Sequence, residues 1–138
     1  MDTKSEVYER CYALVASYLK QSFGDLAEQL DESDGFIVTL GDRYAYVLVG
    51  QMGDDNASVS VYSFPGRGIS VTSEIAIRLL EMNNEYRFGA LSIDDDGDIM
   101  FECPLPSEGL TKAALALIVR LIATSTADID DELRMRFS

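Results

Sequence analysis

Two short apolar runs joined by an aspartate-rich turn constrain the fold of this chain more than any other feature. In residues 90–106, apolar and polar side chains alternate, as they do in strands that are buried on one face. A two-residue turn would put Ile93 and Ile99 on opposite faces, whereas a three-residue turn at 95–97 pairs them. The sequence therefore predicts a hairpin with the longer turn and with Gly97 at its left-handed position.

The other apolar patterns predict three helices and three more strands. A repeat of three and four residues indicates helices, and a repeat of two indicates strands. The helices are expected at 3–23, 72–83 and 111–137, and the further strands at 36–40, 43–51 and 58–64. The last helix either runs unbroken or stops near residue 126, followed by a short separate helix. The order α-β-β-β-α-β-β-α predicts an α+β domain spanning 1–138, with a five-stranded, mostly antiparallel sheet and helices mainly on one face.

Individual residues are expected to mark where the elements begin and end. Thr3 and Glu6 fit a capping box, and Gly24 suits the end of the first helix. The acidic segment 25–34 is expected to be a solvated loop or an edge segment. Prolines 104 and 106 are expected to end the last strand, because proline donates no ladder hydrogen bond.

The first hairpin divides its side chains between two faces. A two-residue turn at Gly41-Asp42 places an aliphatic set on one face: Phe36, Val38, Leu40, Ala45, Val47 and Val49. The opposite face is far more aromatic than a solvated sheet face should be. Its candidate partner-binding residues are Ile37, Tyr44, Tyr46 and Leu48, and by the same alternation Tyr62 and Phe64 of the strand at 58–64 join them. These six residues are here called the tyrosine face. Either a partner chain or a second copy covers this face, or residues 24–34 fold over it.

The charge balance restricts the classes of partner. The chain has 24 Asp and Glu against 11 Lys and Arg, which gives a formal net charge of -13 over 138 residues. Such a field repels phosphate backbones and anionic lipid, so we expect neither a nucleic-acid nor a membrane partner. The negative net charge favours a basic or amphipathic polypeptide as the partner. The alternative is that the charge serves only to keep the protein soluble.

The sequence contains no combination of side chains typical of a catalytic or ligand-binding site. We therefore expect no catalytic residue, cofactor or metal site. The chain has no histidine, which removes the commonest general base and zinc ligand, and Cys11 and Cys103 read as buried free thiols. The glycine-rich loop 65–68 lacks the spacing of a phosphate-binding loop. The aspartates of 92–103 fail the EF-hand pattern at both of its decisive ends.

The first twenty residues mix acids, bases and tyrosines, unlike a signal peptide, and no apolar run is long enough to span a bilayer. A cytoplasmic location is therefore expected.

The second half of the chain carries a series of short motifs: LEMN at 80–83, RF at 87–88, LSID at 91–94, DG at 96–97 and LPSEGLT at 105–111. With these motifs the chain resembles the YbjN family of bacterial sensory-transduction-regulator-like proteins. That family is similar in fold to the small acidic type III secretion chaperones. The resemblance covers residues 72–137 by motif and the remainder by element order.

The resemblance implies a non-enzymatic, chaperone-like module that binds a peptide or protein and is commonly a homodimer. It carries over no catalytic residues, because its motifs are structural. The alternative is a regulatory or sensory protein that binds a small ligand or a divalent cation.

Overall fold

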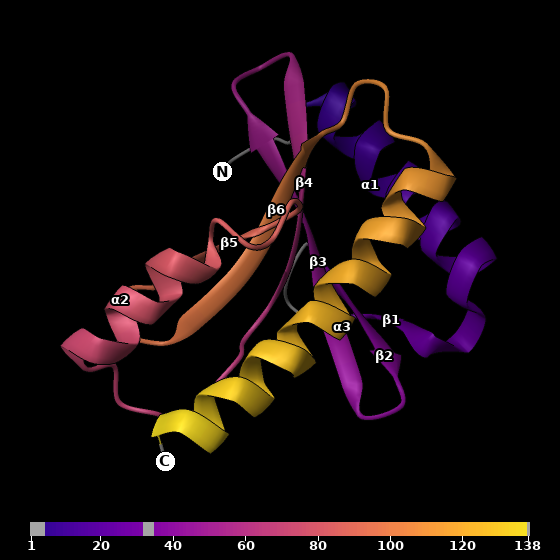
Figure 1. The fold of residues 1–138 in the computed structure, drawn as a ribbon. Helices are drawn as coiled ribbons and strands as arrows, with labels where there is room; N and C mark the ends of the chain where they lie inside the picture. The colour runs from indigo at the N-terminus through magenta and orange to yellow at the C-terminus, as the bar shows by residue number, and fades with distance from the viewer. Residues whose placement is uncertain (1–4, 32–34, 138) are drawn as a thin grey trace.

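The chain folds into an antiparallel sheet of six strands with three helices (Figure 1). The structure is a computed structural model that describes residues 5–31 and 35–137. The helices are α1 (Glu6–Phe23), α2 (Ser73–Met82) and α3 (Lys112–Phe137). The strands are β1 (Ala27–Gln29), β2 (Gly35–Leu40), β3 (Arg43–Met52), β4 (Asn56–Ser63), β5 (Ala90–Ile93) and β6 (Ile99–Pro106), in the spatial order β1-β2-β3-β4-β6-β5. The predicted α+β class is confirmed, whereas the predicted number of five strands is wrong.

The additional strand is β1, which lies in the acidic segment expected to be a loop or an edge. A short 3-10 turn, η1 (Gly24–Leu26), follows α1 and leads into β1. There Ala27 pairs with Val38 and Gln29 pairs with Phe36, so β1 forms one edge of the sheet. Three residues with a carboxylate in the middle give too short a pattern for sequence to identify a strand.

The hairpin of β2 and β3 has the predicted register. Phe36 pairs with Val47, Val38 with Ala45, and Leu40 with Arg43. Gly41 has a φ of 70°, which the turn requires and which glycine adopts without steric cost. The two faces of this hairpin are therefore divided as the sequence predicts.

The hairpin of β5 and β6 has the predicted three-residue turn. Ile93 pairs with Ile99, the amide of Asp94 donates to the carbonyl of Asp98, and Gly97 has a φ of 84°. The Asp94 carboxylate accepts from the amides of Asp96 and Asp98 at 3.0 and 2.9 Å, which holds the turn. Ile93 itself is exposed, so the apolar face that β5 and β6 share is not buried at the end next to the turn.

Asn83, which belongs to the LEMN motif, joins α2 to the sheet. Its side-chain Oδ1 accepts from the amide of Leu91 at 2.7 Å, and its Nδ2 donates to the carbonyl of Leu91 at 3.2 Å. The side chain thus makes the pair of bonds that a neighbouring strand would make to β5. This is a structural role, as expected for the motif.

Strand β6 continues through its two prolines, so the prediction that they end it is wrong. Pro104 pairs with Ser60 and Pro106 with Ser58, while β5 pairs only as far as Glu102. The amide of Ser107 donates to Ala57, which places the nitrogens of 104 and 106 on the side away from β4. Because β5 has already ended there, the missing N–H groups break no ladder bond.

Helix α3 is continuous, and of the two alternatives the separate short helix is therefore wrong. Thr111 caps its start by accepting from the amide of Ala114, as predicted. The polar run 124–126 does not break it, because Thr126 lies on the buried stripe between Ile122 and Ile129. The apolar face therefore stays in phase across the polar run.

Helix α1 begins with Ser5 as its cap, accepting from the amide of Tyr8. The predicted cap, Thr3, lies outside the described residues. Gly24 ends the helix as predicted, and its φ of 57° with a ψ of −130° is not the left-handed helical conformation. Helix α2 begins with the predicted cap Thr72.

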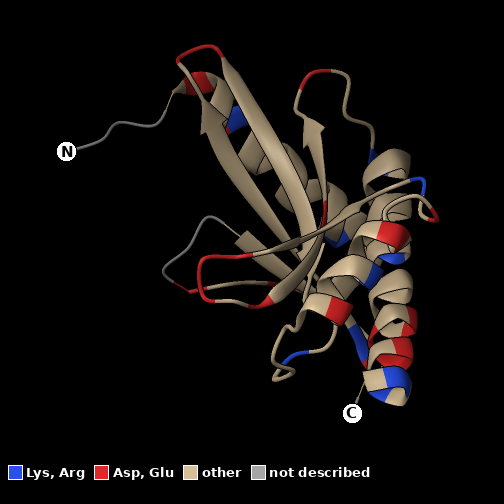
Figure 2. Ribbon diagram, turned by 60° about the vertical axis from the view of Figure 1, so that its left-hand side comes forward, with Lys and Arg blue, Asp and Glu red and all other residues tan. Residues whose placement is uncertain are grey.

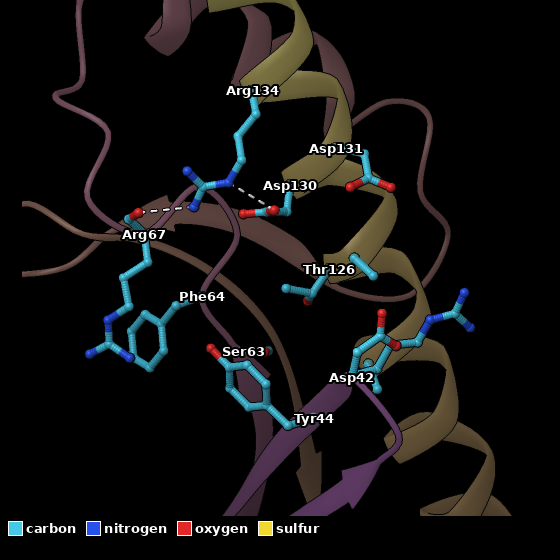
Figure 3. Close-up of a pocket in the computed structure, with 12 residues that line it drawn as sticks. Asp42, Tyr44, Ser63, Phe64, Arg67, Thr126, Asp130, Asp131 and Arg134 are labelled. Atoms are coloured by element: carbon cyan, nitrogen blue, oxygen red, sulfur yellow. Dashed lines mark hydrogen bonds and ion pairs between the residues drawn. The ribbon is translucent and has the colours of Figure 1, made fainter. Parts of the chain in front are cut away.

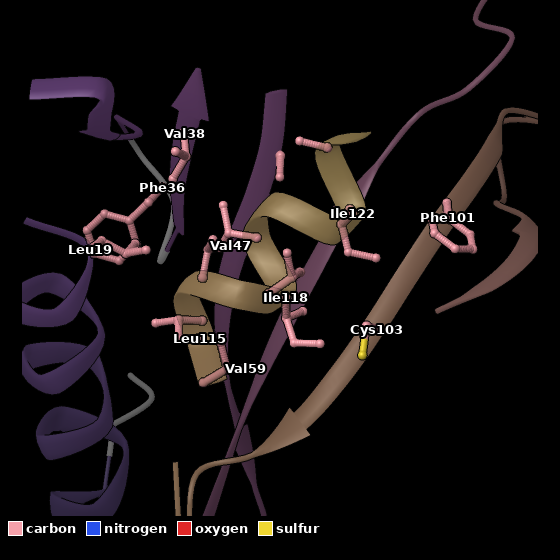
Figure 4. Packing of buried hydrophobic residues seen from close by; sticks show 14 of the residues in the cluster. Leu19, Phe36, Val38, Val47, Val59, Phe101, Cys103, Leu115, Ile118 and Ile122 are labelled. Atoms are coloured by element: carbon pink, nitrogen blue, oxygen red, sulfur yellow. The ribbon is translucent and has the colours of Figure 1, made fainter. Parts of the chain in front are cut away.

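The helices cover one face of the sheet, and no described helix lies on the other. Helices α1 and α3 pack against each other and against β3 and β4, and α2 packs on β5. The core between them is aliphatic, with Phe101 among its largest residues and Ile118 and Ile122 of α3 facing the strands (Figure 4). Cys11 and Cys103 are free and buried as predicted, and desolvation raises the pKa of both thiols.

Candidate functional site

The tyrosine face lies on the side of the sheet opposite to α1 and α3. Across β3 and β4, Tyr46 pairs with Tyr62, while Val47 pairs with Val61 one residue further along. The valines are fully buried and the tyrosines are half-buried. Because side chains alternate along a strand, the helices cover the valines and leave the tyrosines on the outer face.

Four of the six predicted residues form one continuous aromatic cluster. The Tyr46 and Tyr62 rings stack with their centroids 5.3 Å apart and an interplanar angle of 24°. Tyr44 meets Tyr46 edge-on at 5.5 Å, and Phe64 meets Tyr62 edge-on at 5.8 Å and Tyr46 at 6.0 Å. These separations are in the range in which aromatic pairs attract, so the rings hold one another in place.

The two aliphatic members of the tyrosine face lie beside the cluster. Ile37 of β2 pairs with Tyr46, and Leu48 of β3 pairs with Ser60 and is 38% exposed. The structure thus places all six predicted residues on one face, with Ile37 directly opposite a ring of the cluster and Leu48 opposite Ser60.

The strands that carry this face have few charges. Figure 2 shows acidic residues gathered in turns and helices, while the strands are nearly uncharged. Glu102 of β6 pairs with Tyr62 on the same face. Burial, then the neighbouring Tyr46 and Glu102, raises the pKa of Tyr62 above its ordinary value.

The segment 24–34 was one candidate to cover this face. Its residues 27–29 instead form β1, which pairs with β2 in the plane of the sheet and extends it, with Glu28 opposite Ile37. Residues 32–34 lie outside the described part of the chain.

Two features of the surface were not identified from the sequence. Met100 and Glu102 continue the tyrosine face onto β6, which only the non-local pairing of β4 with β6 reveals. A second apolar area lies between α2 and β5, where Leu80 is 69% exposed and lies beside Leu79 and Ile93. The exposed Leu80 belongs to the apolar repeat that predicts the helix at 72–83, and this repeat is the signal in the sequence that could have identified the area.

A cavity of about 300 Å³ opens at the end of the tyrosine face, between the β2–β3 turn, the end of β4 and α3 (Figure 3). Tyr44 and Phe64 form part of its wall. Asp130 accepts from the Gly66 amide at 2.7 Å and from Arg134 Nε at 3.0 Å, which ties α3 to the loop after β4. This cavity was also missed, because its residues come from segments far apart in the sequence.

Within the described residues, no group of three or more Cys, Asp or Glu side chains is arranged to hold a metal ion. Across the same residues, no helix has both the length and the apolar composition needed to cross a membrane.

Comparisons with known proteins agree with the fold. Two solved structures share the fold: the type III secretion chaperone SycH of Yersinia pestis, in complex with a stable fragment of YscM2, and a chain of the ExoU-SpcU heterodimeric complex from the type III secretion system of Pseudomonas aeruginosa. The first superposes with a TM-score of 0.57 at 10% identity, covering 86% of this chain and 98% of that one. The second has a TM-score of 0.51 at 13% identity, covering 83% and 93%. At these identities the likeness shows the fold alone.

No curated protein matches the sequence at a significant level. Residues 9–138 match the family described as T3SS (YopN, CesT) and YbjN peptide-binding chaperone 1. The match covers nearly the whole chain, including the motifs around α2, β5 and β6. This chain belongs to that family of peptide-binding chaperones.

Proposed function

We propose that this chaperone binds an extended client segment on the tyrosine face. The observation that carries the proposal is the cluster of four aromatic rings on nearly uncharged strands. The family is one of peptide-binding chaperones that act by binding, and we propose binding without catalysis here as well.

The cluster suits a polypeptide ligand for physical reasons. Tyrosine gives a large contact area with few rotatable bonds, and its hydroxyl can bond to a client backbone. Mutual ring packing fixes the side chains before the client arrives, which lowers the entropic cost of binding.

The net charge of -13 supports a basic or amphipathic client, because it attracts positively charged segments and speeds their encounter. Two free buried thiols are consistent with a reducing compartment, and we place the protein in the cytoplasm of a bacterium.

Photocrosslinking tests where the client lies. The probe is a ten-residue peptide with alternating apolar and polar positions that carries one benzophenone side chain. After irradiation and trypsin digestion, we expect the label on the peptide 44–67, which contains five of the six residues of the tyrosine face. An excess of the same peptide without benzophenone should suppress this crosslinking. Labelling confined to 113–120, which carries exposed Leu117 on α3, would overturn the proposed site.

We also infer that the chaperone is a homodimer. Support comes from the apolar area between α2 and β5, where Leu80 and Ile93 are both exposed. Large apolar side chains in contact with each other on a surface are typical of protein interfaces. This area is separate from the tyrosine face, so one copy can pair with another while each keeps its client face open.

A further inference from the structure

The cavity at the end of the tyrosine face is placed to receive one side chain of a bound client. Tyr44 and Phe64 belong both to the tyrosine face and to the cavity wall (Figure 3). A segment lying along the rings therefore reaches the cavity where it passes around the end of the sheet, because Ser63 and the α3 residues of the lining are on the helical side. A volume of about 300 Å³ is at the lower end of the range for ligand sites, which suits a single side chain.

Two buried hydroxyl groups in the lining have no hydrogen-bond partner. Ser63 is fully buried and Thr126 is 6% exposed, and neither side-chain oxygen is bonded within the described residues. Unsatisfied buried hydroxyls are uncommon in folded proteins, and each costs about 1–3 kcal/mol. Both residues line the cavity, but their oxygens are inaccessible to water, so a hydrogen-bond donor that enters it can satisfy them only when the lining shifts on binding.

The carboxylates at the cavity differ in whether they already form hydrogen bonds and ion pairs within the protein. Asp130 is occupied by Gly66 and Arg134. Asp42 and Asp131 also line the cavity, are exposed, and make no hydrogen bond or ion pair within the described part of the chain. These two carboxylates are therefore available to an incoming cation.

The lining holds three arginines against three aspartates, so its formal charges balance, and the arginines differ in how far they are engaged. Arg134 is engaged with Asp130, and it also donates to the carbonyl of Arg67 at 3.0 Å. The Arg67 guanidinium lies 4.6 Å from the centre of the Phe64 ring, so this wall already binds one cation on an aromatic face. Arg43 is the lining cation with neither an ion pair nor a ring contact among the described residues.

We propose that the cavity is an anchor site for a lysine or arginine side chain of the client. The aliphatic stem lies against Tyr44 and Phe64, and the cationic head donates to Asp42, Asp131 and the buried hydroxyls. The net charge of -13 favours a cation over an anion at this site. This inference rests on the proposed function, because it assumes that the client lies on the tyrosine face.

The test compares three fluorescein-labelled ten-residue peptides with alternating apolar and polar positions. They differ at one position near the end, which is lysine, norleucine or glutamate. Norleucine keeps an aliphatic stem without the charge, so its affinity reports the tyrosine face alone. The difference between lysine and norleucine reports the cavity.

Three variants then assign that difference to named groups. D42N/D131N removes the free carboxylates, and R43Q removes the free cation. D54N/D55N makes the same change in net charge as the first variant, but in the turn at the other end of β3. Thermal unfolding of each variant checks that the fold is retained.

Fluorescence anisotropy should show the lysine peptide binding more tightly than the norleucine peptide, by about two- to fivefold for each carboxylate it meets. We expect D42N/D131N to abolish the difference, R43Q to increase it, and D54N/D55N to leave most of it. If the lysine and norleucine peptides bind equally, or if the glutamate peptide binds most tightly, the anchor site is overturned. The proposed function is unaffected by either result. Binding of none of the three peptides would overturn both.

Discussion

At the scale of single residues, Arg78 joins helix α2 to helix α3. Its Nε and Nη2 donate to the two carboxylate oxygens of Glu132 at 2.8 and 2.9 Å, and Nη1 donates to Glu85 at 2.9 Å. The Arg78 side chain is only 16% exposed. Two parallel bonds from one guanidinium fix the distance and the angle between the helices.

This contact predicts a pH dependence of stability. The hydrogen bonds from Arg78, more than any other effect, hold the pKa of Glu132 below its ordinary value of 4.5. A carboxyl whose pKa is lower in the folded state stabilises the fold above its ordinary pKa and loses that contribution as the pH falls through the lowered value.

Glu132→Gln should therefore lower the free energy of unfolding by about 1 kcal/mol at pH 7. Urea titrations of the wild type and the variant should converge as the pH falls below 4.5. Glu81→Gln is the control, since Glu81 contacts the same arginine only at 3.6 Å and is 60% exposed. A gap that persists unchanged at low pH would show that Glu132 acts by packing and not by charge.

At the scale of elements, the sequence predicts best where a short turn fixes the register. The Gly41-Asp42 and 95–97 turns each leave one pairing that keeps the apolar residues together, and the structure has both pairings. Elements whose limits depend on distant neighbours are predicted less well. Strand β1 exists only as a partner of β2, and β6 continues past Pro104 because β5 has already ended.

The helices show the same dependence on neighbours. The run 124–126 suggests a break when only local preference is considered. Thr126 packs inside, and the spacing of Ile122, Ile129 and Leu133 keeps one stripe on the core. Burial of that stripe outweighs the weak helix preference of the polar residues.

At the scale of the whole molecule, the tyrosine face was predictable and the cavity was not. Alternation within one hairpin puts Tyr44 and Tyr46 on the outer face, and the same argument adds Tyr62 and Phe64. The cavity draws on the β2–β3 turn, the end of β4 and α3, and no local pattern brings those segments together.

The proposed homodimer is also a property of the whole molecule. Leu80→Glu puts a charge into the apolar area between α2 and β5, and burying an unpaired carboxylate there is costly. Size-exclusion chromatography with light scattering should give twice the chain mass of 15.2 kDa for the wild type and a single chain for the variant. Leu117→Glu, a similarly exposed leucine on α3, is the control and should remain dimeric. A wild-type mass of one chain would contradict the dimer.

Affinity for the norleucine peptide after removal of the central rings tests the role of the tyrosine face most directly. Tyr46→Ser/Tyr62→Ser removes the stacked pair, and Leu117→Ser is the control on the helical side. We predict that the double variant keeps its circular dichroism spectrum and binds about tenfold more weakly, because each aromatic contact contributes about 0.5–1.5 kcal/mol. Unchanged affinity in a folded double variant, or unfolding that shows the two rings to be core, would contradict a client site on this face.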